Sequence, residues 1–419
     1  MLLRRRRLTA EVWRGRAAII GGAILVGLAA IAFAWSADRA NDAFNLIVAR
    51  RWWLPLLITP AGYVLIVWIT NRVAPAARGS GIPQIIAAKR DPANATADLA
   101  SGRTAAVKAV LTAAALAVGG SVGREGPTVQ LGATIMAYAH KLLRVPVNAS
   151  VLVAGAAAGV AAAFNTPLAG VAFAIEELAA AYEQRMTLLV MTAVLIAGMI
   201  AQGVAGDYVY FGIVGQTLPL ATVVIVAPVA GVVGGVCGSL FARLTLWFAR
   251  GGARRISGGR PLLLAAISGV IVAAIGVLTG TTWGTGYGAA RAIIEGSDSS
   301  LWFGPAKFVS TLATAAAGLP GGIFAPSLAT GAGLGNLLHA IFPGQPTGAL
   351  VLLAMAGYFT GVVRAPLTAV IIMSETTGSR GLMLPLLATA LIAEGAAGLV
   401  CRERLYHGLA LGFGQAERK

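Results

Sequence analysis

Two stretches that lie 199 positions apart share the placement of a glycine and a proline. The first reads Gly123-Arg124-Glu125-Gly126-Pro127, and the second reads Gly321-Gly322-Ile323-Phe324-Ala325-Pro326. They belong to an ungapped repeat in which residues 108–176 match residues 307–375 at 16 of 69 positions. Matched alanines carry little weight in this chain, but pairs such as Lys108/Lys307 are informative. The repeat predicts two related halves, unless Gly- and Ala-rich segments resemble one another by composition alone.

The composition is that of a membrane protein. Hydrophobic residues make up 57% of the 419 residues and charged residues only 11%, whereas soluble proteins carry about 25% charged residues. The net charge of +16 does not indicate nucleic-acid binding, because the basic residues lie between apolar runs and not in stripes beside aromatics. Cys237 and Cys401 exclude a disulfide scaffold. Three histidines without ligand spacing support neither a metal centre nor another cofactor.

Apolar runs of very uneven length follow one another along the chain. A simple span needs about 20 residues, so the shorter and longer runs predict tilted and broken helices. Non-helical backbone at membrane depth is tolerated where protein shields it or where it lines a watery cavity. Paired Gly/Pro breaks in two halves also indicate a midplane binding site. The main runs cover residues 17–34, 52–70, 105–118, 147–175, 186–206, 209–242, 261–286, 308–363 and 382–393.

The basic residues predict the orientation of the chain. Six arginines within residues 1–16 indicate a basic amphipathic helix at the cytoplasmic interface. The following apolar run has no clear cleavage site, so we expect a retained first span and not a signal peptide. Further arginines gather at residues 243–260 and 402–418. Since short cytoplasmic loops carry the excess of Lys and Arg, both termini are predicted to be cytoplasmic.

Glu125 lies directly before a Gly-Pro helix start in an apolar region. An ionisable residue at membrane depth is costly and is a functional hypothesis by default. The free N–H groups and the positive dipole end of a helix attract anions. The carboxylate could therefore occupy an anion's place and vacate it when protonated. The alternative is that Arg124 and Glu125 form an ion pair in a surface loop.

The corresponding stretch of the second half has apolar Ile323 and Phe324 in place of the charged pair. An anion there would contact backbone N–H groups only, and such weak binding suits rapid passage. The alternative is a glycine pair used for helix packing. A further helix start, Gly79-Ser80-Gly81-Ile82-Pro83, offers the hydroxyl of Ser80 as a neutral donor. That serine could equally be an ordinary helix cap.

Two segments near the ends of apolar runs leave their role open. The run through Asn165-Thr166-Pro167-Leu168-Ala169-Gly170 ends at Glu176-Glu177, and Tyr406 follows Arg404-Leu405 near the C-terminus. Acidic and aromatic residues at these places can simply mark the membrane boundary.

Together and in this order, four stretches resemble the CLC family of chloride channels and chloride/proton antiporters. They are GSGIP at 79–83, GREGPTVQLG at 123–132, NTPLAGVAFAIEE at 165–177 and GGIFAPSLATGA at 321–332. The resemblance is to the bacterial type, without regulatory nucleotide-binding domains. It implies an all-α integral membrane fold of two inverted-topology halves with tilted, broken and re-entrant helices. It also implies a homodimer with one pathway per subunit.

The same resemblance implies a role for particular residues. The anion would be held by two side-chain hydroxyls and two backbone amides, those of Ser80, Tyr406, Ile323 and Phe324. Glu125 resembles the external gating and proton-transfer glutamate, and Glu177 resembles the internal proton-transfer glutamate of the antiporters. Ser80, in place of the Met or Pro of fluoride and nitrate transporters, favours chloride. Gln84 stands where many relatives have an acid.

The predicted function is secondary active exchange of chloride for protons across a bacterial plasma membrane. The predicted segments are a cytoplasmic helix (1–16), two transmembrane halves (17–214 and 215–406) and a short cytoplasmic tail (407–419). One alternative is a passive chloride channel of the same fold. Another is a membrane-embedded hydrolase or lipid-modifying enzyme with Glu125 or Glu177 as its base, for which the sequence offers no nucleophile arrangement and no metal cluster. The protein is therefore predicted not to be an enzyme.

Overall fold

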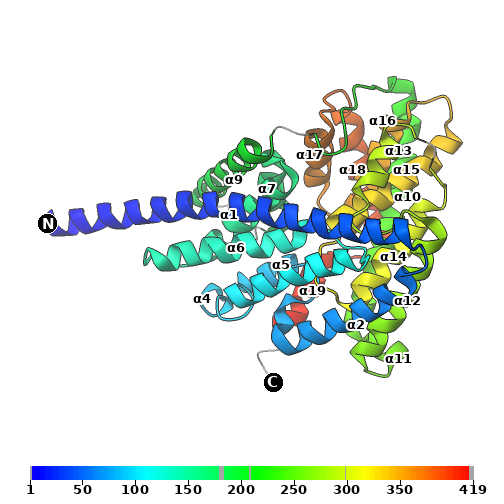
Figure 1. Cartoon of the computed structure of the whole chain (residues 1–419). Helices are drawn as coiled ribbons and strands as arrows, with labels where there is room; N and C mark the ends of the chain where they lie inside the picture. The colour runs from blue at the N-terminus through cyan, green and yellow to red at the C-terminus, as the bar shows by residue number, and fades with distance from the viewer. Residues whose placement is uncertain (1, 179–183, 207–208, 298, 415–419) are drawn as a thin grey trace.

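The computed structural model describes residues 2–178, 184–206, 209–297 and 299–414, and it builds them mainly into helices (Figure 1). Three short turns of other helix types accompany the α-helices: η1 (Pro75–Ala77), η2 (Ala174–Leu178) and η3 (Phe248–Gly252). In chain order the α-helices are α1 Leu2–Arg50, α2 Pro55–Val73, α3 Ile82–Ala88, α4 Pro92–Ala95, α5 Gly102–Ala117, α6 Glu125–Leu142, α7 Ala149–Phe164, α8 Pro167–Phe173, α9 Gln184–Ala205, α10 Leu220–Trp247, α11 Ala253–Ser257, α12 Pro261–Thr279, α13 Tyr287–Ile294, α14 Phe303–Ala317, α15 Phe324–Ile341, α16 Thr347–Val363, α17 Pro366–Thr377, α18 Met383–Val400 and α19 Leu405–Gly414.

Several helices are long and apolar enough to cross a membrane. Within the described residues they are parts of α1, α2, α9, α10, α12 and α18. Other helices are too short for a full crossing of about 20 residues, among them α3 and α8, with seven residues each. The mixture of long and short helices confirms the predicted fold of an integral membrane protein with broken, re-entrant segments.

Helix α1 is continuous from Leu2 to Arg50 and forms the long blue rod of Figure 1. The predicted interfacial helix and the first span are thus parts of one helix. Its polar stretch beyond the apolar run stays helical, and Asp38 there forms a salt bridge of 2.6 Å with Arg124. The cytoplasmic position of residues 1–16 remains a prediction.

The core of the molecule lies along α7 and α16. Residues 151–164 of α7 and 348–363 of α16 are buried throughout, as expected of helices that are apolar on all sides. Helix α6 packs on α7, and α15 packs on α16 in the same way. A Cβ on Gly132 of α6 would lie 2.3 Å from the carbonyl oxygen of Gly155. A Cβ on Gly331 of α15 would likewise lie 2.6 Å from Cα of Met355. The repeat found in the sequence is therefore a repeat of packing.

Reciprocal contacts relate the two halves by a two-fold axis. Gly123 and Gly322 form an antiparallel bridge in which each N–H donates to the other's carbonyl oxygen at 2.7 Å. Glu176 accepts hydrogen bonds from the first turn of α17, and Glu375 accepts them from the first turn of α8. When residue i contacts j and the equivalent of j contacts the equivalent of i, the two units are related by a two-fold. The halves run antiparallel where they meet, which confirms the inverted topology.

The halves lie side by side in Figure 1. Helices α5, α6, α7 and α9 gather on one side, and α10, α13, α15, α16 and α18 gather on the other, with α1 crossing both. Helix α19, the last and reddest in the figure, returns to pack against α3 of the first half. This return brings Tyr406 to the centre of the molecule.

Candidate functional site

The first turns of α3, α6 and α15 meet at the centre of the molecule. Glycine is required for this approach, because a Cβ on Gly126 would lie 2.3 Å from Oγ of Ser80 and 3.1 Å from Cα of Gly322. Each helix start leaves N–H groups without an intrahelical partner and carries the positive end of the helix dipole. The meeting point is therefore suited to a small anion.

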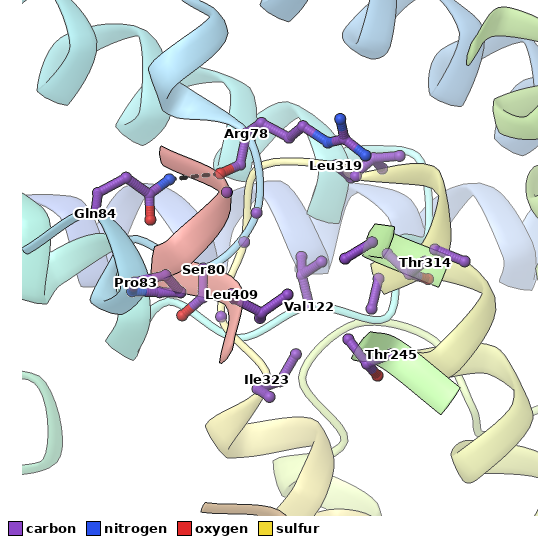
Figure 2. Close-up of a pocket in the computed structure, with 18 of the residues that line it drawn as sticks. Arg78, Ser80, Pro83, Gln84, Val122, Thr245, Thr314, Leu319, Ile323 and Leu409 are labelled. Atoms are coloured by element: carbon purple, nitrogen blue, oxygen red, sulfur yellow. Dashed lines mark hydrogen bonds between the residues drawn. The ribbon is translucent and has the colours of Figure 1, made fainter. Parts of the chain in front are cut away.

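Two buried hydroxyls lie at this point. Ser80 is 7% exposed and Tyr406 is fully buried. Among the described residues, neither hydroxyl oxygen has a hydrogen-bond partner. Buried polar groups without partners are costly, so these two mark a place for a ligand that accepts hydrogen bonds. Ser80, Ile323 and Tyr406 line one cavity of about 490 Å³, and Figure 2 shows Ser80 and Ile323 on its walls.

The side chain of Phe324 fixes the start of α15. Its ring packs against those of Phe173, Phe359 and Tyr406, with centroid separations of 5.5, 4.9 and 6.0 Å. The ring is completely buried. Phe324 therefore offers an anion its backbone amide, while its ring ties Tyr406 to the same helix start.

Glu125 is completely buried at the start of α6. Its Oε1 accepts a hydrogen bond of 2.6 Å from the hydroxyl of Tyr287 on α13. Its Oε2 has no hydrogen-bond partner among the described residues. Oε2 lies close to the starts of α6 and α15. A Cβ built on Gly123 would lie 2.3 Å from Oε2 and 3.2 Å from Cβ of Ala325 in the first turn of α15. The carboxylate thus lies beside the same helix starts that are suited to an anion.

Arg124 is buried and directed away from Glu125. Its guanidinium forms the salt bridge with Asp38, donates to the carbonyl of Ala34 at 2.9 Å and contacts the hydroxyl of Tyr210. Arg124 is 4% exposed. The alternative of a surface ion pair between Arg124 and Glu125 is therefore wrong.

Glu177 lies away from the helix tips, in the π-helical turn η2, and is completely buried. Its Oε1 is 3.2 Å from Nδ1 of His407 on α19, and its Oε2 has no partner among the described residues. The adjacent Glu176 has a different environment, because both its carboxylate oxygens cap α17. The acidic pair therefore divides into a structural cap and a carboxylate with unused hydrogen-bonding capacity.

Two buried lysines hold equivalent loops in the two halves. Lys108 donates to the carbonyl of Gly79 at 2.9 Å, and Lys307 donates to that of Gly284 at 2.7 Å. The loops read Gly79-Ser80-Gly81 before α3 and Gly284-Thr285-Gly286 before α13. All four glycines have φ between +59° and +110°, a backbone region that residues with a Cβ disfavour. The loop that carries Ser80 is therefore built like the loop that leads to Tyr287.

Sequence reasoning missed Tyr287 and His407, the side-chain partners of the two central glutamates. A signal for Tyr287 exists, because its Gly-Thr-Gly loop repeats the Gly-Ser-Gly loop at an offset of 205 residues. The ungapped comparison at an offset of 199 residues could not reveal this match, because the two loops lie 205 residues apart. The structure brings Ser80, Ile323, Phe324, Tyr406 and Glu125 together, and it places Glu177 beside His407, the residue that follows Tyr406 on α19.

The fold and this site define a membrane protein for ion transport, built as an inverted repeat. Its sequence over residues 62–398 matches the family described as Voltage gated chloride channel. The match covers most of the chain, so the protein belongs to the CLC family.

Solved structures share this fold. A slow cyanobacterial Cl⁻/H⁺ antiporter has a TM-score of 0.82 at 24% identity, over 97% of this chain and 99% of its own. A eukaryotic CLC transporter has a TM-score of 0.76 at 21% identity, over 94% and 74% of the two chains. A CLC-type fluoride/proton antiporter has a TM-score of 0.78 at 22% identity, over 90% and 94%. At such identities the similarity shows the fold alone.

Proposed function

We propose that this CLC protein exchanges chloride for protons. The observation that carries the proposal is a pair of completely buried carboxylates, Glu125 and Glu177. Each has one oxygen in contact with a polar side chain and one without a partner among the described residues. Burying an ionised group with incomplete hydrogen bonding is costly, and binding a proton removes that cost. The two groups are therefore suited to accept and release protons.

Chloride would bind between the hydroxyls of Ser80 and Tyr406 and the amides of Ile323 and Phe324. Among the described residues the wall of the cavity around them contains no lysine, and the guanidinium of its arginine, Arg78, lies beside Leu319 and is not directed at Ser80 (Figure 2). Neutral dipoles hold an anion without trapping it, which conduction requires. The fit of a halide is supported by the two hydroxyls that lack protein partners.

Glu125 would couple the two ions by competition for the helix tips. Ionised, its carboxylate lies at the starts of α6 and α15 and excludes chloride. Protonated, it loses its attraction to the helix dipoles and moves away, so that chloride takes its place. Tyr287 favours the ionised, seated position by donating to Oε1.

Glu177 would carry the proton along a separate route. Neither Glu177 nor its partner His407 lines the cavity that reaches Ser80. The side chain of His407 is 44% exposed, so it connects the buried carboxylate to water. The anion and the proton therefore share the region of Glu125 and diverge beyond it.

The test is paired recording of chloride and protons in proteoliposomes. We expect a chloride gradient to drive uphill proton movement with the unmodified protein. Glu125→Ala and Glu177→Gln should abolish proton movement while chloride still passes. Glu176→Gln is the matched control, because this neighbouring acid caps α17 and should leave coupling intact. Chloride flux without any proton movement in the unmodified protein would instead indicate a passive channel.

The proposal extends to the setting of the protein. We infer that it lies in a bacterial plasma membrane with both termini in the cytoplasm, which the arginines near residues 243–260 support. We also infer a homodimer with one pathway per subunit, as the family resemblance implies. Mass measurement of the purified protein in detergent tests the dimer, and labelling of cysteines placed near each terminus tests the orientation.

A further inference from the structure

Two cavities meet on the side of the molecule where Arg250 and α11 lie, which is called the Arg250 side below. The inner one, of about 490 Å³, reaches Ser80 and Tyr406. The outer one, of about 880 Å³, is bordered by the charged residues near α11. Their walls have seven residues in common: Asn71, Arg78, Phe248, Ala249, Gly318, Leu409 and Gly412. An ion that travels from the outer cavity to Ser80 therefore passes this shared wall.

Arg78 is the charged residue of the shared wall. Its backbone is fixed, because its carbonyl oxygen accepts a hydrogen bond of 2.6 Å from Nε2 of Gln84 (Figure 2). Its side chain runs along the wall over Gly318, where a Cβ would lie 2.4 Å from Nε. Figure 2 shows the guanidinium above Leu319, away from Gln84. Arg78 is two residues from Ser80, a chain distance of at most about 7 Å.

The guanidinium of Arg78 has unused binding capacity. Among the described residues it forms no ion pair, and its five N–H donors have no acceptor at hydrogen-bond distance. In the outer cavity Arg250 pairs with Glu403, while Arg254 adds a positive charge that no ion pair among the described residues offsets. Asp98 lines the inner cavity without pairing with Arg78. The shared wall therefore carries a fixed positive charge.

We propose that Arg78 is a capture site for the transported anion, where chloride waits before it moves to Ser80 and Tyr406. The capture site rests on the proposed function in one respect, namely that chloride is the anion the protein transports. A cation in a cavity with low-dielectric walls raises the local concentration of anions. A guanidinium is weakly hydrated and accepts an anion readily. A competing explanation is that Arg78 only stabilises the carboxyl end of α14, which ends beneath it, through the helix dipole.

The experiment compares Arg78→Gln, Arg78→Lys and Arg72→Gln in planar bilayers, with chloride varied on one side at a time. Arg72 is the matched control, because it lies at the end of α2, stacks on Trp68 and lines neither cavity. For chloride supplied from the Arg250 side, Arg78→Gln should raise the half-saturating concentration roughly tenfold at low ionic strength. Arg78→Lys and Arg72→Gln should stay close to the unmodified protein. Chloride supplied from the other side should show no change in half-saturation.

A second variant separates charge from packing. Arg78→Cys, in a background with Cys237→Ala and Cys401→Ala, should regain chloride affinity after modification with a positively charged methanethiosulfonate. A negatively charged reagent should lower the affinity further. If both reagents act alike, or if Arg78→Gln lowers only the melting temperature, Arg78 is a helix-end contact and the capture site is refuted.

Failure of the broader function gives a different result. If the unmodified protein moves chloride without protons, the antiporter proposal fails but the one-sided effect of Arg78→Gln still holds. If it moves no chloride at all, both proposals fail. If chloride is coupled to protons and Arg78→Gln has no effect on half-saturation, only the capture site fails.

Discussion

Replacing Tyr287 by phenylalanine tests how the carboxylate of Glu125 is held. The change removes the hydroxyl that donates to Oε1 at 2.6 Å. It keeps the ring, which packs against Tyr210 and Phe211 with centroids 4.5 and 5.5 Å away. A hydrogen bond to a charged group contributes about 1.5–3 kcal/mol. Because Tyr287 is only half-buried, the lower end applies, which corresponds to roughly a tenfold shift toward the released carboxylate.

We expect Tyr287→Phe to raise the rate of chloride efflux from proteoliposomes several-fold and to lower the number of protons moved per chloride. The matched control is Tyr63→Phe, which removes a buried hydroxyl that is hydrogen-bonded to Thr314 at 2.7 Å and not to either glutamate. Tyr63→Phe should leave the coupling ratio unchanged. If Tyr287→Phe gives the rate and coupling of the unmodified protein, the tyrosine does not hold the gate and the reasoning is refuted.

Three further predictions concern the framework of the site. Gly123→Ala places a Cβ 2.3 Å from Oε2 of Glu125, so under the proposed function it should displace the carboxylate and weaken proton coupling in the same liposome assay. Lys307→Met removes two hydrogen bonds and Lys108→Met removes one. At about 1 kcal/mol per bond, Lys307→Met should lower the thermal unfolding temperature in detergent more, and equal shifts would contradict this reasoning. Glu176→Ala and Glu375→Ala each uncap one helix, so both should cost about 1–2 kcal/mol, and a large difference would contradict their equivalence.

The architecture was largely predictable because the repeat and the helix starts are local signals. Glycine and proline mark where α6 and α15 begin, and the match between residues 108–176 and 307–375 follows the same helices in both halves. The break inside the run 147–175 appears as Asn165, whose left-handed φ of 57° ends α7. Its equivalent, Arg364, has a φ of 65° and ends α16. Such backbone events leave a trace in the sequence.

The side-chain partners were not predictable because they join distant parts of the chain. Tyr287 meets Glu125 across 162 positions, and His407 meets Glu177 across 230. The length of α1 was also missed, because its polar stretch past residue 34 is stabilised by a contact with Arg124 and not by its own composition. The roles given to Ser80 and the other site residues stay predictions until transport is measured.

The two halves are related by a two-fold axis, but their sequences differ at the helix starts beside the Gly123–Gly322 bridge. Equivalent positions around the Gly123–Gly322 bridge carry Glu125 in one half and Phe324 in the other. Two acids there would give a symmetric pathway with a gate at either end, and two apolar residues would leave no group to bind a proton. One acid opposite one aromatic gives a helix tip that an ionisable side chain can occupy and a second tip that only an anion can fill. The scaffold supplies two equivalent helix starts, and under the proposed function the difference between Glu125 and Phe324 would make one of them responsive to protons.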